Sequence, residues 1–537
     1  MMRAAGLCCV LGVMLMISIG RAGAEAEMPI CLAPNSIQSN PAADGGRVVW
    51  ADGRTEDPDL PPTGSDIYLY DLATGVETPI CVEAGAQIYP EIDGDRIVWL
   101  DNRSGNWEIY LHDLSTGATR KIASAPTTRL LESRGPDISG DTIVWADERA
   151  HPTSHKLDVF MYDLPTDSLT QITSAEADQG LGGPRVEGKR IVWCDTRGDP
   201  AGDIYMYDME LEAEFPVATW PGSESQPDIW GTEVVYTRAV GEGVWNIFYR
   251  DVATASEPLA LAPVGAAQFR PLVAGRWVVW SDYREGDLAT GLSQVYVYDL
   301  ELHQLHPMAS YPFGDWPGLS EAGVMVWMDW RNGDRAIYED PDIYGYVLTR
   351  FWDVLADQWA YSAIEACVAA GIVSGYPEGD YKPSDPVTRD QMAVYISRAL
   401  AEGDSNVPAF AGTPSFPDVG EDSWALRYVE YAVEQGVVTG FEDGSYQPLL
   451  EVDRGQMAVY IARSIATPTG EAGLVGYSPP DTPTFPDVPV GFWAYKHVEY
   501  CVEHGVVQGY GDGWYYPGNV VTRDQMAVYV KRAFGLP

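Results

Sequence analysis

The stretch YPEIDGDRIVWLDNRSGNWEIYLHDLSTG, residues 89–117, decides how most of this 537-residue chain folds. It holds two β-rich runs, Arg96-Ile-Val-Trp99 and Glu108-Ile-Tyr-Leu-His-Asp113, each bounded by turn residues. The Ser115-Thr-Gly117 turn then leads into another short run of strand type. Runs of this length and alternation are typical of strands, and four strands in about 46 residues are typical of one propeller blade.

The same unit recurs seven times between residues 29 and 350. Each copy has a β-rich run that ends in an aromatic residue: Arg47-Val-Val-Trp50, Arg96-Ile-Val-Trp99, Thr142-Ile-Val-Trp145, Arg190-Ile-Val-Trp193, Glu233-Val-Val-Tyr236, Trp277-Val-Val-Trp280 and Val324-Met-Val-Trp327. A proline stands shortly before each run: Pro41, Pro90, Pro136, Pro184, Pro227, Pro271 and Pro317. Seven copies predict an all-β, seven-bladed propeller over residues 29–350.

The two ends of this region predict how the ring closes. Pro29-Ile-Cys-Leu32 matches Pro79-Ile-Cys-Val82, the last strand of the first full repeat, although no blade precedes it. The seventh repeat stops at its third strand, Tyr344-Gly-Tyr-Val-Leu348. We therefore expect residues 29–33 to supply the missing outer strand of the seventh blade, which would leave no open edge.

The rhythm Pro…Asp-Gly…Ile-Val-Trp…Ile-Tyr-x-x-Asp-x-x-Thr-Gly over residues 29–350 resembles that of the TolB-like propeller family. The resemblance concerns structural positions. It implies a fold and says little about function, because this fold serves binders, scaffolds and enzymes.

An Asp-x-Arg pair follows the aromatic residue in six repeats: Asp52/Arg54, Asp101/Arg103, Asp147/Arg149, Asp195/Arg197, Asp282/Arg284 and Asp329/Arg331. Residues two apart on a strand share a face, so the ring, the carboxylate and the guanidinium align. The pairs are either a ring of ligand sites or structural ion pairs. Recurrence in six blades favours a structural ion pair that ties each blade to its loop or neighbour.

The residue before each repeat proline varies, and the innermost strands start there. These residues are Asn40, Tyr89, Gly135, Gly183, Gln226, Arg270 and Trp316. We predict that Tyr89, Gln226, Arg270 and Trp316 lie at the mouth of the propeller channel. Their aromatic and polar groups suit a carbohydrate or peptide through stacking and hydrogen bonding. The alternative is ordinary loop variation.

A second repeat family follows, with three copies at fixed offsets. The copies begin at Phe351-Trp-Asp-Val354, Phe416-Pro-Asp-Val419 and Phe485-Pro-Asp-Val488. Each then has a tryptophan, a glycine and an arginine: Trp359, Gly371 and Arg389; Trp424, Gly436 and Arg454; Trp493, Gly505 and Arg523. This strict spacing predicts one helical unit repeated over residues 351–400, 416–466 and 485–537, joined by linkers at 401–415 and 467–484.

The second helix of each copy opens with a capping box: Thr388-Arg-Asp-Gln391, Asp453-Arg-Gly-Gln456 and Thr522-Arg-Asp-Gln525. An arginine in the first turn faces the positive end of the helix dipole, which is unfavourable. We therefore interpret it, with free helix N–H groups, as an anion-binding site. The alternative is a surface arginine paired with a nearby carboxylate.

These motifs resemble S-layer homology domains, which usually occur as three tandem copies. The resemblance implies an α-helical, three-lobed domain whose grooves hold secondary cell-wall polysaccharide, often acidic or pyruvylated, or another peptidoglycan-linked polymer. It implies binding by Arg389, Arg454 and Arg523, joined by Asp353, Asp418 and Asp487 and by Trp359, Trp424 and Trp493. The tryptophans could instead be core residues.

Two positions depart from the pattern of the repeats. Asp453 stands where the other copies have threonine, which puts a carboxylate beside Arg454 and predicts weak binding of an acidic glycan there. Trp352 stands where the other copies have proline, which predicts a differently shaped entry to the first copy.

Residues 1–24 read as a secretory signal peptide, with Arg3, an apolar run from Leu7 to Ile19 and a small-residue cleavage site ending at Ala24. That run is short for the alternative, a membrane anchor, and no later segment predicts a membrane span. Cleavage would remove two arginines and no acid, changing the net charge from −44 to −46. Nucleic acid and anionic membranes need basic patches, so neither is expected as a partner.

Catalytic motifs are not recognisable in the sequence. It has no GxSxG elbow, HExxH pair or Walker loop, and we expect no catalytic residues, cofactor or metal site. The sequence thus predicts a multidomain, secreted protein of the cell surface, cell wall or S-layer. Three repeats would anchor it non-covalently to wall polysaccharide, and the propeller would be a binding or scaffold module. The alternative is a wall-attached enzyme whose propeller acts on a polysaccharide or peptide.

Overall fold

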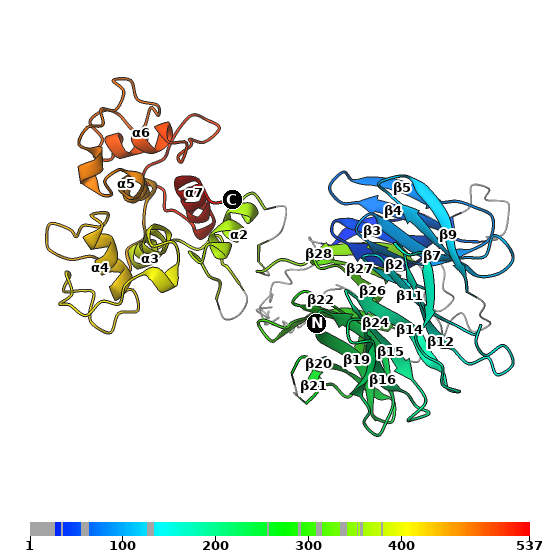
Figure 1. Ribbon diagram of the computed structural model, residues 1–537. Helices are drawn as coiled ribbons and strands as arrows, with labels where there is room; N and C mark the ends of the chain where they lie inside the picture. Colours follow the sequence, from blue (N-terminus) through cyan, green and yellow to red (C-terminus); the bar gives the residue numbers. More distant parts are fainter. Residues whose placement is uncertain are drawn as a thin grey trace, which may run out of the picture. The chain divides into compact units, whose positions relative to one another are not determined.

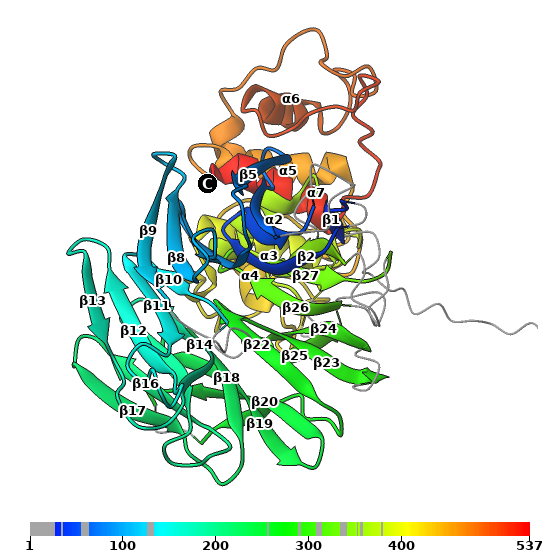
Figure 2. The ribbon, with the colours of Figure 1, turned by 90° about the vertical axis from the view of Figure 1, so that its right-hand side faces the viewer.

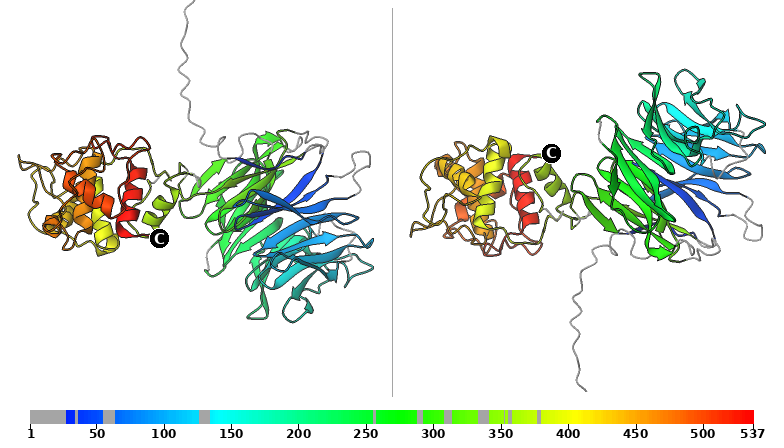
Figure 3. Two further views of the ribbon diagram at one scale, coloured as in Figure 1. Left: turned by 90° about the horizontal axis from the view of Figure 1, so that it is seen from above. Right: turned by 90° about the horizontal axis from the view of Figure 1, so that it is seen from below.

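The structure is a computed structural model that describes residues 27–33, 36–54, 64–125, 134–254, 257–287, 292–307, 314–332, 341–351, 353–354, 358–376 and 380–537. The predicted signal peptide, residues 1–24, and Trp352 lie outside these residues. The chain divides into two compact units, Met1–Leu348 and Thr349–Pro537. Strands build the first unit and helices the second (Figure 1 and Figure 3).

The first unit is a propeller of seven four-stranded antiparallel sheets, which fan around an axis in Figure 2. Blades one to three consist of β2 (Gln38–Asp44), β3 (Arg47–Asp52), β4 (Asp66–Asp71) and β5 (Val76–Cys81); β6 (Gln87–Asp93), β7 (Arg96–Asp101), β8 (Glu108–Asp113) and β9 (Ala118–Ser124); and β10 (Asp137–Ser139), β11 (Thr142–Asp147), β12 (Asp158–Asp163) and β13 (Ser168–Gln171). Blades four to six consist of β14 (Gln179–Glu187), β15 (Arg190–Asp195), β16 (Asp203–Asp208) and β17 (Ala213–Ala218); β18 (Glu224–Trp230), β19 (Glu233–Gly241), β20 (Val244–Asp251) and β21 (Leu259–Leu261); and β22 (Gln268–Ala274), β23 (Trp277–Asp287), β24 (Leu292–Asp299) and β25 (Gln304–Pro307).

The seventh blade contains strands from both ends of the propeller sequence. It consists of β26 (Gly314–Leu319), β27 (Val324–Asp329), β28 (Asp342–Val347) and β1 (Met28–Cys31). β1 pairs antiparallel with β28, with Met28 opposite Gly345 and Cys31 opposite Ile343. The predicted closure of the ring by the N-terminal strand is confirmed.

Neighbouring blades share apolar cores. Val49 and Ala51 of the first blade, for example, pack with Ile97 and Trp99 of the second. Equivalent cores join five further pairs of adjacent blades in the described part of the ring. The second strand of each blade is buried on both faces, which explains its nearly continuous run of β-branched and aromatic residues. Each blade therefore depends on its neighbouring blades for part of its stability.

The second unit contains six α-helices among its described residues, two from each repeat. They are α2 (Tyr361–Ala369), α3 (Arg389–Leu400), α4 (Leu426–Glu434), α5 (Arg454–Ile465), α6 (Tyr495–Glu503) and α7 (Arg523–Phe534). The first helix of each repeat packs on the second helix of another: α4 on α3, α6 on α5, and α2 on α7 (Figure 1). The helices α3, α5 and α7 also contact one another, and one apolar core runs through all three repeats.

The two predicted linkers contain short 3-10 helices, Asp404–Asn406 and Glu471–Leu474. Asp404 accepts hydrogen bonds from Nε of Arg398 at 2.7 Å and Nη2 of Arg427 at 2.8 Å. Leu474 is fully buried in the shared core. The linkers thus also help to pack one repeat against the next.

Candidate functional site

The inner strand of each propeller blade is kinked at the residue before the repeat proline. The backbone φ is positive at all seven of these residues: Asn40, Tyr89, Gly135, Gly183, Gln226, Arg270 and Trp316. In most blades the pairing register shifts there too, as between Ile88 and Glu91. A positive φ is uncommon outside glycine, and such bulges redirect side chains. The variable positions therefore share a backbone conformation that sequence reasoning did not foresee.

These kinks surround a cavity of about 200 Å³ in the propeller. Tyr89, Gln226, Arg270 and Trp316 all line it, so the structure brings together the four predicted mouth residues. Arg270 pairs with Asp315 at 2.5 Å, and its guanidinium carbon lies 3.9 Å from the centre of the Trp316 ring. Oε1 of Gln226 accepts from the backbone N–H of Arg270 at 2.8 Å. Whether these residues bind a ligand stays a prediction.

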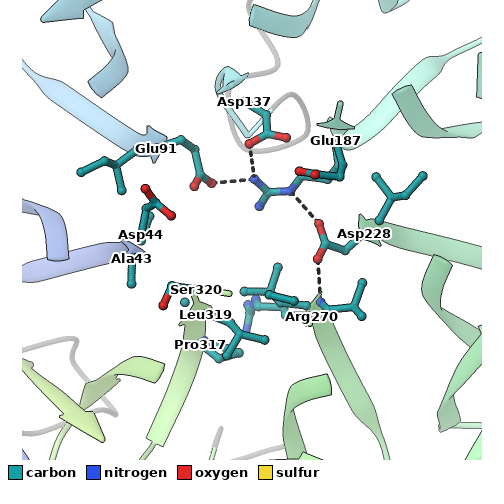
Figure 4. Close-up of a pocket in the computed structure, with 18 of the residues that line it drawn as sticks. Ala43, Asp44, Glu91, Asp137, Glu187, Asp228, Arg270, Pro317, Leu319 and Ser320 are labelled. Atoms are coloured by element: carbon teal, nitrogen blue, oxygen red, sulfur yellow. Dashed lines mark hydrogen bonds and ion pairs between the residues drawn. The ribbon is translucent and has the colours of Figure 1, made fainter. Parts of the chain in front are cut away.

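An arginine with three carboxylates occupies another part of the cavity. Arg185 lies 2.6 Å from Glu91, 3.4 Å from Asp137 and 4.0 Å from Asp228 (Figure 4, dashed lines). Asp137 also accepts from the backbone N–H of Val186, and Asp228 from that of Val273, both at 2.7 Å.

The four charged residues come from the second to fifth blades, so the cluster ties four blades together. Burial raises the pKa of Asp137 to about 7 and that of Asp228 to about 6, against the opposing effect of Arg185.

Sequence reasoning missed this charged cluster although a signal was present. Each of its members directly follows a repeat proline, as Glu91 follows Pro90 and Arg185 follows Pro184. The equivalent residues in the other blades are Ala42, Leu272 and Gly318. A charge at this position in four of seven repeats could have identified the cluster.

The six Asp-x-Arg pairs are structural, as predicted. In each, Oδ2 of the aspartate accepts from the indole Nε1 two residues earlier at 2.7–3.0 Å. The arginine two residues later donates Nη2 to the same carboxylate at 2.5–2.6 Å. Its guanidinium also lies over an aromatic ring of the adjacent strand, such as Tyr110 for Arg103. The carboxylate is fully buried in all six, so the motif is a local lock within each blade.

The fifth blade has the same lock with the charges exchanged. In four other blades a glutamine on the inner strand stands opposite the aspartate, as Gln87 opposite Asp101. In the fifth blade Glu224 stands opposite Arg238, and the two lie 3.1 Å apart. Burial raises the pKa of Glu224 to about 7. The carboxylate has moved to the neighbouring strand, which explains why this repeat lacks the motif.

In the second unit, the arginine of each repeat reaches into another repeat. Nε of Arg389 donates to the carbonyl of Tyr446 at 2.7 Å, that of Arg454 to Tyr515 at 2.8 Å, and that of Arg523 to Tyr381 at 2.7 Å. Each tyrosine hydroxyl donates back to the carbonyl of its arginine, at 2.6–3.1 Å. The three arginines are only 4–5% exposed. They join the repeats in a closed cycle.

The helix N–H groups next to these arginines are occupied as well. The backbone N–H of Arg389 donates to the carbonyl of Leu450 at 2.9 Å, and that of Asp390 to Pro448 at 3.0 Å. Equivalent bonds form in the other two repeats. The expectation of free N–H groups at these helix starts was therefore wrong, and so was the alternative of a carboxylate-paired surface arginine. The backbone N–H groups and the arginine side chains donate to carbonyls of the adjoining repeat instead.

The three predicted aspartates brace a turn in their own repeat. Asp353 accepts from the backbone N–H groups of Tyr381 and Lys382 at 2.7 and 2.6 Å. Asp418 and Asp487 make the same pair of bonds at 2.6–3.0 Å. The second residue of each turn has positive φ, so the carboxylate holds a conformation that is otherwise unfavourable.

The three predicted tryptophans are exposed, so their interpretation as core residues was wrong. Trp359, Trp424 and Trp493 are 62%, 61% and 59% exposed. A side chain at Gly455 would meet Trp493 at 3.1 Å, so this ring lies beside the start of α5, close to Arg454. An exposed indole next to a junction between repeats is available for stacking against a sugar ring.

Asp453 does not make the second repeat exceptional in charge. In the first and third repeats, Asp390 and Asp524 accept from the backbone N–H of the following glutamine at 2.7 Å. In the second repeat Gly455 replaces that aspartate, and Asp453 accepts from the same N–H at 2.7 Å. Each repeat thus has one carboxylate at this helix start. The reason for predicting weak binding by the second repeat is removed.

Within the described residues, no group of three or more His, Cys, Asp and Glu side chains is arranged to hold a metal ion. A helix of sufficient length and hydrophobicity to cross a membrane is also lacking in that part of the chain.

Comparison with protein families identifies the second unit. Residues 350–393, 415–458 and 484–527 match the S-layer homology domain. The chain carries three S-layer homology domains. Their cyclic packing explains why they occur together, because each S-layer homology domain here completes its neighbour.

Relatives with known names match this chain over about a third of its length. Cell surface glycoprotein 1 of Acetivibrio thermocellus is 28% identical over 161 residues, which cover 30% of this chain and 7% of that protein. The cellulosome-anchoring protein of the same organism is 26% identical over 164 residues, covering 30% of this chain and 35% of that protein. The similarity thus spans a minor part of each relative.

Solved structures similar to the chain include a propeller domain and TolB. The propeller domain of the trilobed protease from Pyrococcus furiosus is 15% identical, with a TM-score of 0.44, and the match covers 58% of this chain and 94% of that one. TolB from Acinetobacter baumannii is 13% identical, with a TM-score of 0.37, over 51% of this chain and 66% of that one.

Proposed function

We propose that this is an exported cell-surface protein, held non-covalently to cell-wall polysaccharide by its three S-layer homology domains. The propeller is then displayed as a binding module. The family match to three tandem domains carries the proposal. Relatives named as surface glycoprotein, cellulosome-anchoring protein and S-layer protein support the same location at the cell surface.

The wall ligand in this proposal is an acidic or pyruvylated glycan that contacts the exposed tryptophans at the three junctions. Trp359, Trp424 and Trp493 are exposed, and Trp493 lies beside the start of α5, where Arg454 adds positive charge. Three weak sites on one chain give avidity well above that of one site. The equal charge of the three helix starts supports binding by all three repeats.

A binding role for the propeller is favoured over an enzymatic one. Glu91, Asp137 and Asp228 face the cavity, but Arg185 and backbone N–H groups engage them. A catalytic pair of carboxyl groups needs one that is available to a substrate as acid and another as base. The engaged carboxylates support binding and structural roles.

Co-sedimentation of the full chain with cell-wall sacculi tests this function. We expect binding to intact walls and loss of binding when the secondary polysaccharide is stripped. A Trp359→Ala/Trp424→Ala/Trp493→Ala variant should bind at least about tenfold more weakly while keeping its helices, because its tryptophans are exposed. Trp220→Ala is the matched control, since Trp220 is a 42% exposed propeller tryptophan. Undiminished binding by the triple variant, or to stripped walls, would refute the proposal.

A further inference from the structure

Arg134 is a cation without an anion at the edge of the propeller cavity. It lines the cavity together with Tyr89, Arg270 and Trp316. Arg270 has a carboxylate partner in Asp315, and Arg185 has three. No carboxylate in the described part of the chain forms an ion pair or hydrogen bond with Arg134, although Asp315 is near enough to attract it, and the guanidinium carbon lies 5.2 Å from the centre of the Trp316 ring. Burial, with Arg270 and Arg185 nearby, lowers the pKa of Arg134 to about 10.

The backbone at Arg134 and Gly135 has an uncommon conformation that brings this segment close to Tyr89. Arg134 and Gly135 both have positive φ, 49° and 86°. A side chain at position 135 would come within 2.6 Å of Cβ of Tyr89, so only glycine permits the close approach of this segment to the ring. A desolvated, unpaired charge costs stability, and such costs are typical of binding sites.

Other hydrogen-bond donors accompany Arg134. The carboxamide oxygen of Gln226 accepts from Arg270 N and from the Thr237 hydroxyl, which leaves its NH2 group to donate. The Tyr89 hydroxyl has no hydrogen-bond partner among the described residues. The carboxylate of Asp315 is engaged by Arg270, Ser281 and the N–H of Trp316. All three bonds end on Oδ1 of Asp315, and none of the donors Arg134, Tyr89 and Gln226 Nε2 is hydrogen-bonded to a described acceptor.

We propose that this end of the cavity binds a small ligand through a carboxylate group, received by Arg134 with Tyr89 and Gln226. A carboxylate matches the planar guanidinium in a bidentate pair and accepts further bonds from neutral donors. The volume of about 200 Å³ is below the 300–1,000 Å³ typical of drug-sized ligands, so the occupant is a small acid or the end of a chain. The aromatic rings of Tyr89 and Trp316 suit a sugar acid. The inference deepens the proposed binding role of the propeller and does not depend on wall anchoring.

Calorimetric titration of the full chain at low ionic strength tests the proposal. Glucuronate and glucose differ only in the carboxylate, so glucuronate should bind and glucose should not. Acetate tells whether the sugar ring contributes: binding as tight as that of glucuronate means that the carboxylate alone is recognised, and weaker binding means that the ring adds affinity. Absence of glucuronate binding, or equal binding of glucose, would overturn the proposal.

Variants locate the site. Arg134→Gln should weaken glucuronate binding at least about tenfold and should melt no lower than the wild type, because it removes an unpaired, desolvated charge. Arg120→Gln is the control, since Arg120 is a 45% exposed propeller arginine paired with Asp167, and it should bind normally. Undiminished binding by Arg134→Gln, or a lower melting temperature, would show that Arg134 has a structural role instead.

The triple tryptophan variant separates this inference from wall anchoring. Trp359→Ala/Trp424→Ala/Trp493→Ala should bind glucuronate as tightly as the wild type does, because the propeller is unchanged. Loss of glucuronate binding in that variant would place the acid site at the S-layer homology domains and would overturn the inference.

Discussion

The two units of this protein use recurring arginines in opposite ways. In the propeller, Arg103 and its counterparts bind an aspartate two residues earlier in the same blade and remain 20–31% exposed. In the S-layer homology domains, Arg454 binds the carbonyl of a tyrosine 61 residues away, in the next repeat, and is 4% exposed. One repeat family completes its lock locally, whereas the other depends on its neighbour.

The hydrophobic cores differ in the same way. Each propeller core joins two adjacent blades, as Val49 and Trp99 show for the first and second blades. A single core runs through all three S-layer homology domains, with Val354, Val419 and Val488 in one cluster. We infer that damage to a blade stays near that blade, while damage to one S-layer homology domain reaches all three.

The largest expected effect comes from breaking the arginine cycle. Arg454→Ala leaves the buried carbonyl of Tyr515, the buried hydroxyl of Tyr529 and the partly buried carbonyl of Gln508 without their donor. We expect a loss of about 3–5 kcal/mol from the unfolding free energy of the second unit. Thermal unfolding followed by circular dichroism at a helical wavelength measures it, because the described α-helices all belong to that unit. Lys496→Ala, at a position 32% exposed, is the control, and an equally small change in Arg454→Ala would contradict the cycle.

A smaller loss should follow when a local lock is broken. Asp101→Asn removes the carboxylate that accepts from Nε1 of Trp99 and pairs with Arg103. We expect a loss of about 2–3 kcal/mol from the propeller, because the arginine keeps access to water. Chemical unfolding followed by tryptophan fluorescence measures this loss.

The pH dependence of Asp101→Asn checks the cause. Burial alone would raise the pKa of Asp101, but the bonds from Arg103 and Trp99 outweigh it and lower the pKa below 3.8. The carboxylate therefore stabilises the fold above the unfolded-state pKa, and this stability is lost as the pH falls through the folded-state pKa. The wild type and the variant should converge below about pH 4. A difference that is constant with pH would exclude the ion pair as its cause.

A double-mutant cycle in the fifth blade measures how strongly its two paired residues, Glu224 and Arg238, depend on each other. Glu224→Gln leaves Arg238 without its carboxylate and Arg238→Gln leaves Glu224 without its cation, whereas the double variant removes both charges together. We expect a coupling free energy of about 1–2 kcal/mol, with the double variant more stable than either single variant. Additive losses in urea unfolding would show that the two residues act independently.

The smallest effect concerns the charged cluster that ties four blades together. The raised pKa of Asp137, about 7, means that the folded protein holds a proton which the unfolded chain releases near pH 4. Stability should therefore fall as the pH rises from about 4 to 7. Asp137→Asn lacks this loss, and at pH 6 it should be about 1 kcal/mol more stable relative to the wild type than at pH 5. Melting curves of both proteins at the two pH values measure this difference. An equal stability difference at both pH values would contradict a buried, protonated Asp137.

Both repeat families could be predicted because they repeat at fixed spacing. Seven copies of a run such as Arg96-Ile-Val-Trp99 determine the number of blades, and the match of residues 29–33 to Pro79-Ile-Cys-Val82 predicts the closure. The Asp-x-Arg locks were predictable because both partners lie two residues apart on one strand. Local spacing is enough wherever the interaction is local.

The junctions and the cavity could not be predicted in the same way. Tyr446 of the second repeat and Tyr381 of the first stand at equivalent positions, so spacing alone does not tell which of them Arg389 contacts. Arg185 and Glu91 lie 94 residues apart and meet only because the ring brings the inner strands of different blades together. Neither contact leaves a signal within a single repeat.

Hydrogen–deuterium exchange on Arg454→Ala and Asp101→Asn most directly tests whether the two units differ in this way. We predict that Arg454→Ala accelerates exchange in all three S-layer homology domains, including the first, which supplies none of the side-chain hydrogen-bond partners of Arg454. Asp101→Asn should accelerate exchange in the second blade and its two neighbours alone. An effect of Arg454→Ala confined to the second and third domains would contradict the account, because those domains would then fold independently of the first.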